Sequence, residues 1–467
     1  MDKSEEKLSK LAILSLVLGI LSLFFFLLAG MPAIVIGIVS TLRIRRSGGK
    51  LKGKYIALAG MNISIVFMSI FYLFWSIDAP PIPNDYTVAD LRSAPAECVE
   101  SFEILKTLLG EETDSSGVSA IELTKSDSRM IADVRGIIKT GTTSEISKAL
   151  DYCAEEIKQI WSDNETARDI IGRLNEFPEI ADLTSPSIDF KIMQLQDIAQ
   201  LPYLYEVYSH LQIEQDDIHA VTVQLIELDS VFRKLSLNAR LLIGKWICNA
   251  CMTADMVTAN SIANNARASQ ESVEMLAGHF TPLTKEQLSL RNSVLFEYLI
   301  NNRHIGQSKA GKIPLLKRNS TLRLYRNLCD GWINAMEGVE DPNIVRFPVW
   351  PSIYQRMGPV SFQGSKPLPL FYICYNPVGA HLMRTMFVSY ESFLKRKAAI
   401  QIHDDLLQIV LNKRLGKDFN LKASVYSDEY IVDLENRKIF SPGLDGTADT
   451  RDDIMLRINP EVLGWRN

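Results

Sequence analysis

The residues best suited to chemistry lie near the C-terminus, in an acidic loop over residues 441–454 that is rich in glycine and aspartate. Four carboxylates fall within nine positions of this loop: Asp445, Asp449, Asp452 and Asp453. Carboxylates this close repel one another unless a cation or hydrogen bonds offset their charge. Calcium, which takes carboxylate and backbone oxygens, suits a glycine-rich loop, although the spacing departs from the helix-loop-helix calcium pattern. The loop predicts either a structural calcium site or a solvated acidic turn to which Arg451 contributes.

This loop resembles the calcium loop that closes the globular domain of the major pseudopilin of type II secretion, a Ser-x-Gly-x-Asp-Gly run followed by a late Asp-Asp pair. The resemblance covers residues 425–457. It implies side-chain calcium ligands at Asp445, Asp452 and Asp453, with backbone oxygens near Ser441 completing the shell. The chain lacks the pseudopilin's N-terminal processing site, so it is not predicted to be a pilin subunit.

The chain has six cysteines: Cys98, Cys153, Cys248, Cys251, Cys329 and Cys374. An even number in an exported protein permits disulfides, but the sequence does not reveal their pairing. Cys248 and Cys251 form a Cys-x-x-Cys pair inside a predicted helix. A redox motif should open a helix after a strand, haem attachment requires His where Met252 stands, and zinc requires a second ligand pair. We interpret the pair as buried core cysteines.

Neither the histidines nor the glycine-rich segments form a recognised catalytic motif. His403 is followed by two aspartates, a potential metal site that is better explained as the exposed face of an amphipathic helix. Residues 306–312 approach a phosphate-binding loop, but Ile313 stands where magnesium binding requires Ser or Thr. The sequence therefore predicts no nucleotide or nucleic-acid binding and no catalytic residue. Whether the protein is an enzyme stays open.

Two apolar stretches, Leu11–Leu42 and Tyr55–Trp75, flank a short loop whose charged residues are all basic. The second stretch has 21 residues, close to the number that spans a bilayer core. Because basic residues in short loops stay on the cytoplasmic side, the loop is predicted to lie inside, against anionic lipid, and the chain after Trp75 outside. We therefore expect a multi-pass protein of the cytoplasmic (inner) membrane with a large exported C-terminal part.

The first apolar stretch has 32 residues, too many for one untilted span, and Gly30–Pro32 is a natural place for a helix to break. In one interpretation Leu11–Leu28 crosses the membrane and Pro32–Leu42 returns as a short or re-entrant helix. In the other, the whole stretch is one tilted span with the N-terminus outside. A cleaved signal peptide is disfavoured because the apolar run is too long and a second span follows.

Residues 8–76 resemble a small bacterial membrane domain of unknown function. In that family an apolar helix is followed by Gly-x-Pro-Ala-Ile-Val-x-Gly, a basic Arg-Arg-Ser-Gly-Gly loop and a second apolar helix. Here these are Gly30 to Gly37, Arg45 to Gly49 and the helix containing Ala57 to Gly60. The resemblance implies an anchor that carries varied exported domains, and it implies no chemistry.

Composition and periodicity predict a mainly α fold with an N-terminal transmembrane hairpin, an exported bundle or solenoid-like domain, and a small C-terminal β-rich unit. The expected parts are an anchor (1–76), a proline-rich linker (77–87), a helical domain (88–305), an irregular Pro/Gly-rich region (306–379), a helix (380–415) and the β-rich unit (416–467). The helices expected in the helical domain are Glu145–Trp161, Glu165–Asn175, Ile192–Gln212 with a kink or split at Pro202, Asp217–Leu235, Ala239–Asn265, Gln270–Gly278 and Thr284–Asn302.

Residues 190–458 also resemble, loosely, a family of uncharacterised exported bacterial proteins. The shared order is a helical region ending near Arg303, the run Tyr375–Met386, a late helix and the pseudopilin-like tail. That family brings no known activity.

We therefore expect a membrane-anchored protein of the bacterial cell envelope whose exported domain binds or scaffolds other envelope proteins, with membrane lipids as further partners. One alternative is an exported hydrolase whose site is assembled only in three dimensions and includes some of His279, His304 and His381. Another is an accessory protein of a secretion or pseudopilus system. The sequence specifies neither the substrate nor the oligomeric state.

Overall fold

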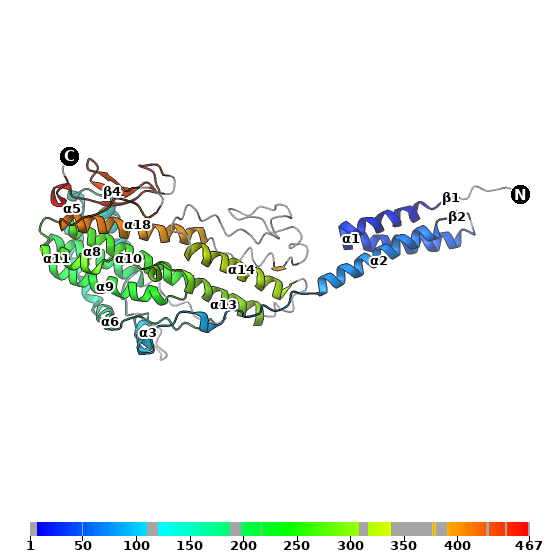
Figure 1. The fold of residues 1–467 in the computed structure, drawn as a ribbon, viewed down its shortest axis with the longest axis horizontal. Helices are drawn as coiled ribbons and strands as arrows, with labels where there is room; N and C mark the ends of the chain where they lie inside the picture. Colours follow the sequence, from blue (N-terminus) through cyan, green and yellow to red (C-terminus); the bar gives the residue numbers. More distant parts are fainter. Residues whose placement is uncertain are drawn as a thin grey trace. The chain divides into compact units, whose positions relative to one another are not determined.

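The computed structural model describes residues 7–48, 50–109, 120–186, 198–215, 217–307, 316–337, 376, 378–379, 390–425, 429–443 and 446–465. The chain divides into two compact units, each described here by itself. Unit 1 comprises Met1–Ile82, Lys312–Thr321 and Leu370–His381, and unit 2 comprises the remaining residues. Figure 1 shows the helices and strands of both units along the sequence.

Unit 1 is built on two apolar helices, α1 (Lys10–Arg46) and α2 (Lys54–Ser76). The hydroxyls of Ser9 and Ser40 lie 3.3 Å apart, although 31 positions separate them. On a straight helix those positions would be about 46 Å apart, so the chain reverses direction within α1. The structure thus agrees with the two-piece interpretation of the first apolar stretch.

The reversal lies slightly ahead of the break expected at Gly30–Pro32. A Cβ placed on Gly30 would lie 3.5 Å from the Cβ of Ser22, so the chain turns between these two residues. Ser15 Oγ then donates to the carbonyl of Ala33 across the two halves of α1 at 3.0 Å. Pro32 therefore falls near the start of the returning half, where a missing N–H costs little.

Glycines allow α2 to pack closely against α1. A Cβ on Gly60 would lie 2.5 Å from the backbone of Ser15, and one on Gly19 would lie 2.5 Å from the carbonyl oxygen of Gly60. Small residues permit this kind of close helix approach in lipid. The result is three helical segments in which the returning half of α1 runs antiparallel to both the first half of α1 and α2.

The first turn of α14 (Arg318–Glu337) also belongs to unit 1. The backbone N–H groups of Asn319 and Ser320 donate to the Asp78 carboxylate at 2.8 and 3.1 Å. A carboxylate at a helix N-terminus satisfies free amides and interacts favourably with the helix dipole. The buried Asn376 accepts from the N–H of Lys317 at 2.9 Å, which fixes the segment that enters the helix.

Unit 2 is mainly helical, which confirms the expected fold class. Its elements before the C-terminal sheet are η1 (Val88–Asp90), η2 (Ala96–Cys98), α3 (Val99–Leu108), α4 (Lys125–Thr140), α5 (Thr143–Asp163), α6 (Glu165–Asn175), α8 (Gln200–Glu214), α9 (Ile218–Asn238), α10 (Leu242–Ala263), α11 (Gln270–His279), α12 (Lys285–Leu288), α13 (Arg291–Gln307), the rest of α14, and α18 (Tyr390–Arg414).

Helix α10 lies at the centre of this bundle and packs against α8, α9 and α18. Its buried face is continuous and includes Met252, Met256 and Ile262. These side chains join one apolar core with Leu228 of α9 and Leu407 of α18. Burial of this apolar surface is the main stabilising contribution to the bundle.

Several predicted boundaries are corrected. The helix predicted from Ile192 is interrupted by a turn at Ala199, just ahead of Pro202, and α8 begins at Gln200 with the proline in its first turn, where it is tolerated. Residues 192–197 of that prediction lie outside the described residues. The helix expected over Thr284–Asn302 is divided into α12 and α13, although Thr284 caps α12 as its sequence predicts. Helix α14 occupies residues 318–337, within the region expected to be irregular.

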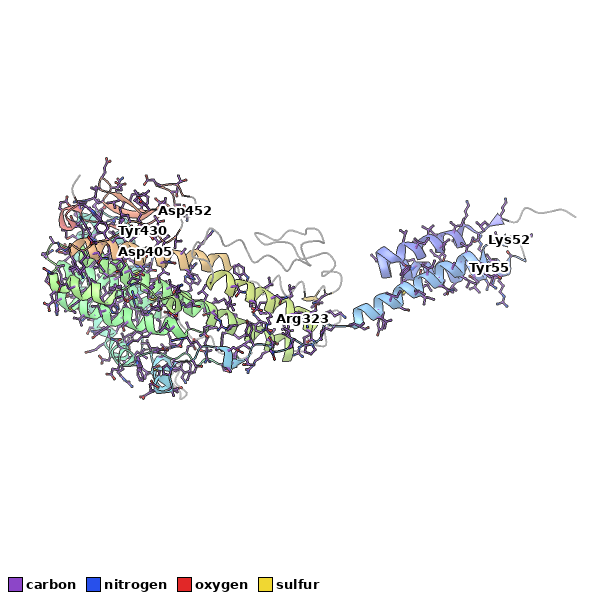
Figure 2. All side chains as sticks on the ribbon, in the orientation of Figure 1. Lys52, Tyr55, Arg323, Asp405, Tyr430 and Asp452 are labelled. Carbon is purple, nitrogen blue, oxygen red and sulfur yellow. The ribbon has the colours of Figure 1, made fainter. Side chains whose placement is uncertain are left out.

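The C-terminal unit is a small antiparallel sheet, in the order β3 (Ile431–Asp433), β4 (Lys438–Ser441), β5 (Ile454–Arg457), followed by α19 (Pro460–Leu463). It packs on α10 and α18. Tyr430 Oη donates to Asp405 Oδ2 of α18 at 2.5 Å, and Asn260 Nδ2 of α10 donates to the carbonyl of Arg457 at 2.9 Å. Tyr430 and Asp405 are labelled in Figure 2.

Candidate functional site

Basic residues gather at one end of unit 1. The strands β1 (Lys7–Leu8) and β2 (Leu51–Lys52) pair in parallel, which brings the N-terminal segment beside the loop that joins α1 to α2. Lysines and arginines from both segments and from the adjoining helix ends lie here: Lys7, Lys10, Arg43, Arg45, Arg46, Lys50, Lys52 and Lys54. Lys52 marks this end in Figure 2. The sequence has no acidic residue between Lys7 and Ile77, so no carboxylate from this stretch neutralises the charge.

The outward faces of the helices in unit 1 are apolar. Large side chains exposed along them include Ile13, Val17, Ile20, Val35, Ile38, Ile65, Val66 and Ile70. Within the described residues, the segment Leu28–Arg46 is long and apolar enough to cross a membrane. Helix α2 has 23 residues and is therefore about 34 Å long, slightly more than the thickness of a bilayer core. Such faces are suited to contact with lipid.

The acidic loop of the C-terminal unit is held by its own hydrogen bonds. The N–H of Asp449 donates to Asp453 Oδ2 at 2.8 Å, and Thr450 Oγ1 donates to Asp452 Oδ1 at 2.8 Å. Lys438 Nζ donates to Asp449 Oδ1 at 2.6 Å, and this contact raises the pKa of the lysine. Hydrogen bonds and one cation thus offset part of the carboxylate repulsion, as a solvated turn requires.

Of the three predicted calcium ligands, Asp452 and Asp453 lie in this loop and Asp445 lies outside the described residues. Gly443 has a φ of 68°, and a Cβ there would meet the carbonyl oxygen of Asp452 at 2.5 Å. The turn therefore requires glycine at this position. No group of three or more His, Cys, Asp or Glu in the described part of the chain is arranged to hold a metal ion. The calcium site stays a prediction.

The described cysteines are free thiols: Cys98, Cys153, Cys248, Cys251 and Cys329. Cys248 and Cys251 lie in the buried face of α10, in agreement with the core interpretation. Burial raises the pKa of Cys248 to about 12 and raises that of Cys251 well above its usual value. Because the thiolate is the reactive form, this environment disfavours redox or nucleophilic chemistry.

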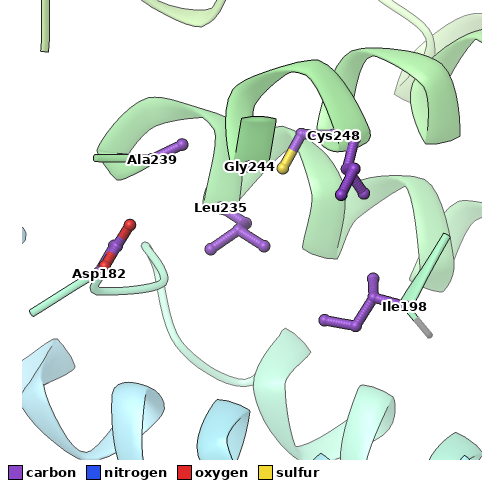
Figure 3. Close-up of a pocket in the computed structure, with 7 residues that line it drawn as sticks. Asp182, Ile198, Leu235, Ala239, Gly244 and Cys248 are labelled. Atoms are coloured by element: carbon purple, nitrogen blue, oxygen red, sulfur yellow. The ribbon is translucent and has the colours of Figure 1, made fainter. Parts of the chain in front are cut away.

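A narrow pocket lies beside Cys248 (Figure 3). The pocket is wide enough to hold about one water molecule. Its lining is apolar apart from Asp182 and Cys248. The Asp182 carboxylate is already engaged, because Oδ2 accepts from the N–H of Arg240 at 2.8 Å and Oδ1 from Thr184 Oγ1 at 2.6 Å. The pocket is therefore part of the packing around the start of α10.

Charged side chains from several helices meet inside unit 2. Arg135 of α4 pairs with the buried carboxylate of Glu206 on α8. On α9, Asp229 Oδ2 accepts from Arg233 Nε at 2.5 Å and contacts His279 Nε2 of α11 at 2.8 Å. Although burial acts to raise the pKa of Asp229, Arg233 and His279 hold it below its usual value.

A third acid, Asp255 of α10, lies near enough to both pairs to interact with their charges. Its side chain is only 1% exposed, and burial together with the charges of Asp229 and Glu206 raises its pKa well above the usual value. One carboxylate oxygen of each of these three acids is buried without a hydrogen-bond partner among the described residues. Burial beside two other carboxylates therefore favours the neutral form of Asp255.

The same network fixes the loop that follows α11. Arg233 Nη1 donates to the carbonyl of Thr281 at 3.0 Å, and the N–H of Leu283 donates to Asp404 Oδ2 of α18 at 2.7 Å. Burial raises the pKa of Asp404 to about 6. The network thus ties α9, α11 and α18 together. Breaking one member of a buried pair costs about 3–5 kcal/mol, so these contacts are important for stability.

The histidines expected for a hydrolase do not form one described cluster. His279 belongs to the buried network, His304 is exposed near the end of α13, and His381 lies outside the described residues. Asp404, expected on the exposed face of its helix, is buried instead.

The sequence did not predict a role for Glu206, Asp229 or Asp255. A signal was present, because Asp229 shares its helical face with Leu225, Leu228 and Phe232, which are apolar. A carboxylate within an apolar stripe indicates a buried charge and an unseen partner.

Comparison with known proteins adds one match. Residues 11–74 match a protein family described as a domain of unknown function (DUF4190). This segment coincides with the resemblance to a membrane domain over residues 8–76. No curated protein and no solved structure matches the chain.

Proposed function

We propose that unit 1 anchors the protein in the cytoplasmic membrane as a multi-pass hairpin, with its basic end inside and unit 2 outside. One observation carries the proposal. The basic residues lie at the end of unit 1 where α2 begins, and the chain leaves α2 at Ser76, about 34 Å further along its axis. A span with this charge asymmetry orients its basic end toward the cytoplasm.

We further propose that unit 2 is a binding or scaffold domain for other envelope proteins. Its buried charged side chains form contacts between helices, and these contacts link α4 to α8 and α9 to α11 and α18. This pairing of charges between helices favours a domain that presents its outer surface to partners.

Reporter fusions test the orientation. Alkaline phosphatase folds only outside the cytoplasm, so a fusion after Asp85 should be active and one after Lys50 inactive. Green fluorescent protein fused at the same two positions should give the opposite pattern. A phosphatase that is active after Lys50 and inactive after Asp85 would overturn the proposed orientation.

Cross-linking in intact cells tests the scaffold role. A photoreactive residue at Tyr152, whose side chain is 91% exposed on α5, should yield discrete adducts with envelope proteins. The matched control carries the same residue at Ile20, on the apolar face of α1, and should yield lipid adducts. Adducts with pseudopilins or secretin components would favour the accessory role in secretion. Absence of protein adducts from several exposed positions of unit 2 would count against a scaffold.

The alternative of an exported hydrolase has one supporting observation, the His279–Asp229 pair at 2.8 Å. A buried carboxylate that orients an imidazole is a recurrent arrangement in general base catalysis. Here the same carboxylate oxygen also accepts a hydrogen bond from Arg233 Nε. A structural role predicts that His279→Gln lowers thermal stability, whereas a catalytic role predicts unchanged stability and loss of any hydrolysis detected with the wild type.

A further inference from the structure

Residues 84–92, at the start of unit 2, lie along the side of α13. Asp85 lies beside Asn302, near the end of that helix, with its Oδ2 accepting from Asn302 Nδ2 at 3.0 Å. Arg92 lies beside Asn292, near its start, with its N–H donating to Asn292 Oδ1 at 2.9 Å. The segment therefore runs antiparallel to α13 for about 15 Å. We call residues 84–92 the strap.

Asp85 joins the strap to both α13 and α14. Its Oδ1 accepts from Tyr298 Oη of α13 at 2.7 Å and pairs with Arg326 Nη1 of α14 at 3.4 Å. The same Arg326 nitrogen donates to the carbonyl of Asn84 at 2.8 Å. Asn84 has a φ of 52°, a left-handed conformation that asparagine tolerates better than most residues. The strap therefore begins with a turn that is held in place by the hydrogen bond and the ion pair of Arg326.

Tyr86 makes a second bridge between the two helices. Its ring packs edge-on against Tyr298 of α13, with centroids 5.7 Å apart, and beneath the guanidinium of Arg326 of α14 at 4.4 Å. Its hydroxyl donates to Asp330 Oδ1, also of α14, at 2.5 Å. Both strap residues therefore contact both helices.

The other end of the strap is fixed to the bundle. Arg92 Nη1 donates to Asn238 Oδ1 at the end of α9, and its Nη2 pairs with Glu179 Oε1, each at 2.8 Å. The buried apolar residues of α13 and α14, such as Tyr298 and Tyr325, form contacts of their own and are not part of the main core around α10. The α13–α14 pair is thus attached to the bundle less extensively than the core helices are to one another.

We propose that the strap is a releasable clasp, whose Asp85 and Tyr86 hold α13 and α14 together while Arg92 keeps the strap attached to the bundle. Its contacts at Asp85 are hydrogen bonds and a partly exposed ion pair, which water can replace, whereas the bundle depends on buried apolar surface. Release would open the α13–α14 pair and leave the bundle folded. Because only residues 77–83 separate the strap from α2, movement of the chain at the membrane would act on this clasp, a consequence that rests on the proposed membrane anchoring.

Hydrogen exchange of the full chain in detergent micelles, read by mass spectrometry, tests the clasp. In Asp85→Asn, amide exchange should accelerate about tenfold or more in peptides from α13 and α14 and stay unchanged in α10. The matched control is Asp90→Asn, the same change at an exposed strap residue whose carboxylate accepts hydrogen bonds from the N–H and Oγ1 of Thr87 within its own turn. It should leave α13 and α14 unchanged.

Tyr298→Phe provides a second variant, since it removes one donor to Asp85 and keeps the aromatic packing. It should accelerate exchange in the same peptides, and in the double variant with Asp85→Asn the two effects should be less than additive. Unchanged exchange in Asp85→Asn, or equal acceleration in α10 and α13, would overturn the clasp. This assay does not depend on orientation, so its failure is distinguishable from failure of the reporter fusions.

Discussion

Asp404 should make the protein less stable as the pH rises, and Asp404→Asn should remove that effect. One of its oxygens accepts from the N–H of Leu283 at 2.7 Å, and the other is buried without a partner among the described residues. Burial, aided by the negative charges of Asp405 and Asp229, raises its pKa from 3.8 to about 6, although the Leu283 N–H and Arg233 oppose the shift. The folded protein therefore holds the proton more tightly than the unfolded chain does.

The direction of the effect follows from this difference. Below about pH 4 the carboxyl is protonated in both states and contributes no pH dependence. Between pH 4 and about pH 6 the unfolded chain loses the proton first, so the free energy of unfolding decreases as the pH rises. A shift from 3.8 to about 6 lowers the free energy of unfolding by at most about 3 kcal/mol. The whole of this loss is present once the pH exceeds the folded-state pKa.

Chemical unfolding of the full chain in micelles, followed by tryptophan fluorescence at several pH values, measures this term. The difference in unfolding free energy between Asp404→Asn and the wild type should grow by about 2–3 kcal/mol in favour of the variant from pH 4 to pH 7.5. Asp418→Asn, at an exposed carboxylate, is the control and should track the wild type. A difference that stays constant with pH, or that shrinks as the pH rises, would refute the assignment of a raised pKa to Asp404.

Three further outcomes are expected. Gly60→Ala should destabilise unit 1 by about 1–3 kcal/mol, because the added methyl would meet the backbone of Ser15, and a thermal unfolding scan in micelles would detect the loss. Thr142→Ala should cost about 1 kcal/mol, since the Thr142 side chain caps α5, with unchanged stability contradicting a role for the cap. If the acidic loop binds calcium, titration of the full chain should release or absorb heat that disappears in the Asp452→Ala, Asp453→Ala double variant. Heat retained in that variant would place the binding elsewhere.

The elements that sequence predicted best are those with strong local signals. The helix over Glu165–Asn175 has both an apolar stripe and clear ends, and α6 matches it. Thr284 followed three residues later by Gln287 has the spacing typical of a capping box, and both side-chain bonds are present. In these segments the local preference of the chain and its tertiary environment favour the same conformation.

The elements that sequence missed depend on contacts between distant segments. Helix α14 lies in a stretch that looks irregular beside its many prolines, and its N-terminus is completed by Asp78, far away in the sequence. The buried network escaped notice because Glu206 and Asp255 resemble ordinary helix charges until folding brings them near Arg135 and Asp229. Because such partners come from distant helices, no fixed spacing in the sequence indicates that they will be buried together.

The most direct test of the account is the side of the membrane on which each unit lies. In a background with Cys153 and Cys374 replaced by serine, single cysteines are introduced at Tyr152, which is 91% exposed, and at Lys50 in the basic loop. A membrane-impermeant maleimide applied to spheroplasts should label Tyr152→Cys and not Lys50→Cys, and both should react after detergent lysis. Labelling of Lys50→Cys but not of Tyr152→Cys in sealed spheroplasts would contradict an exported unit 2.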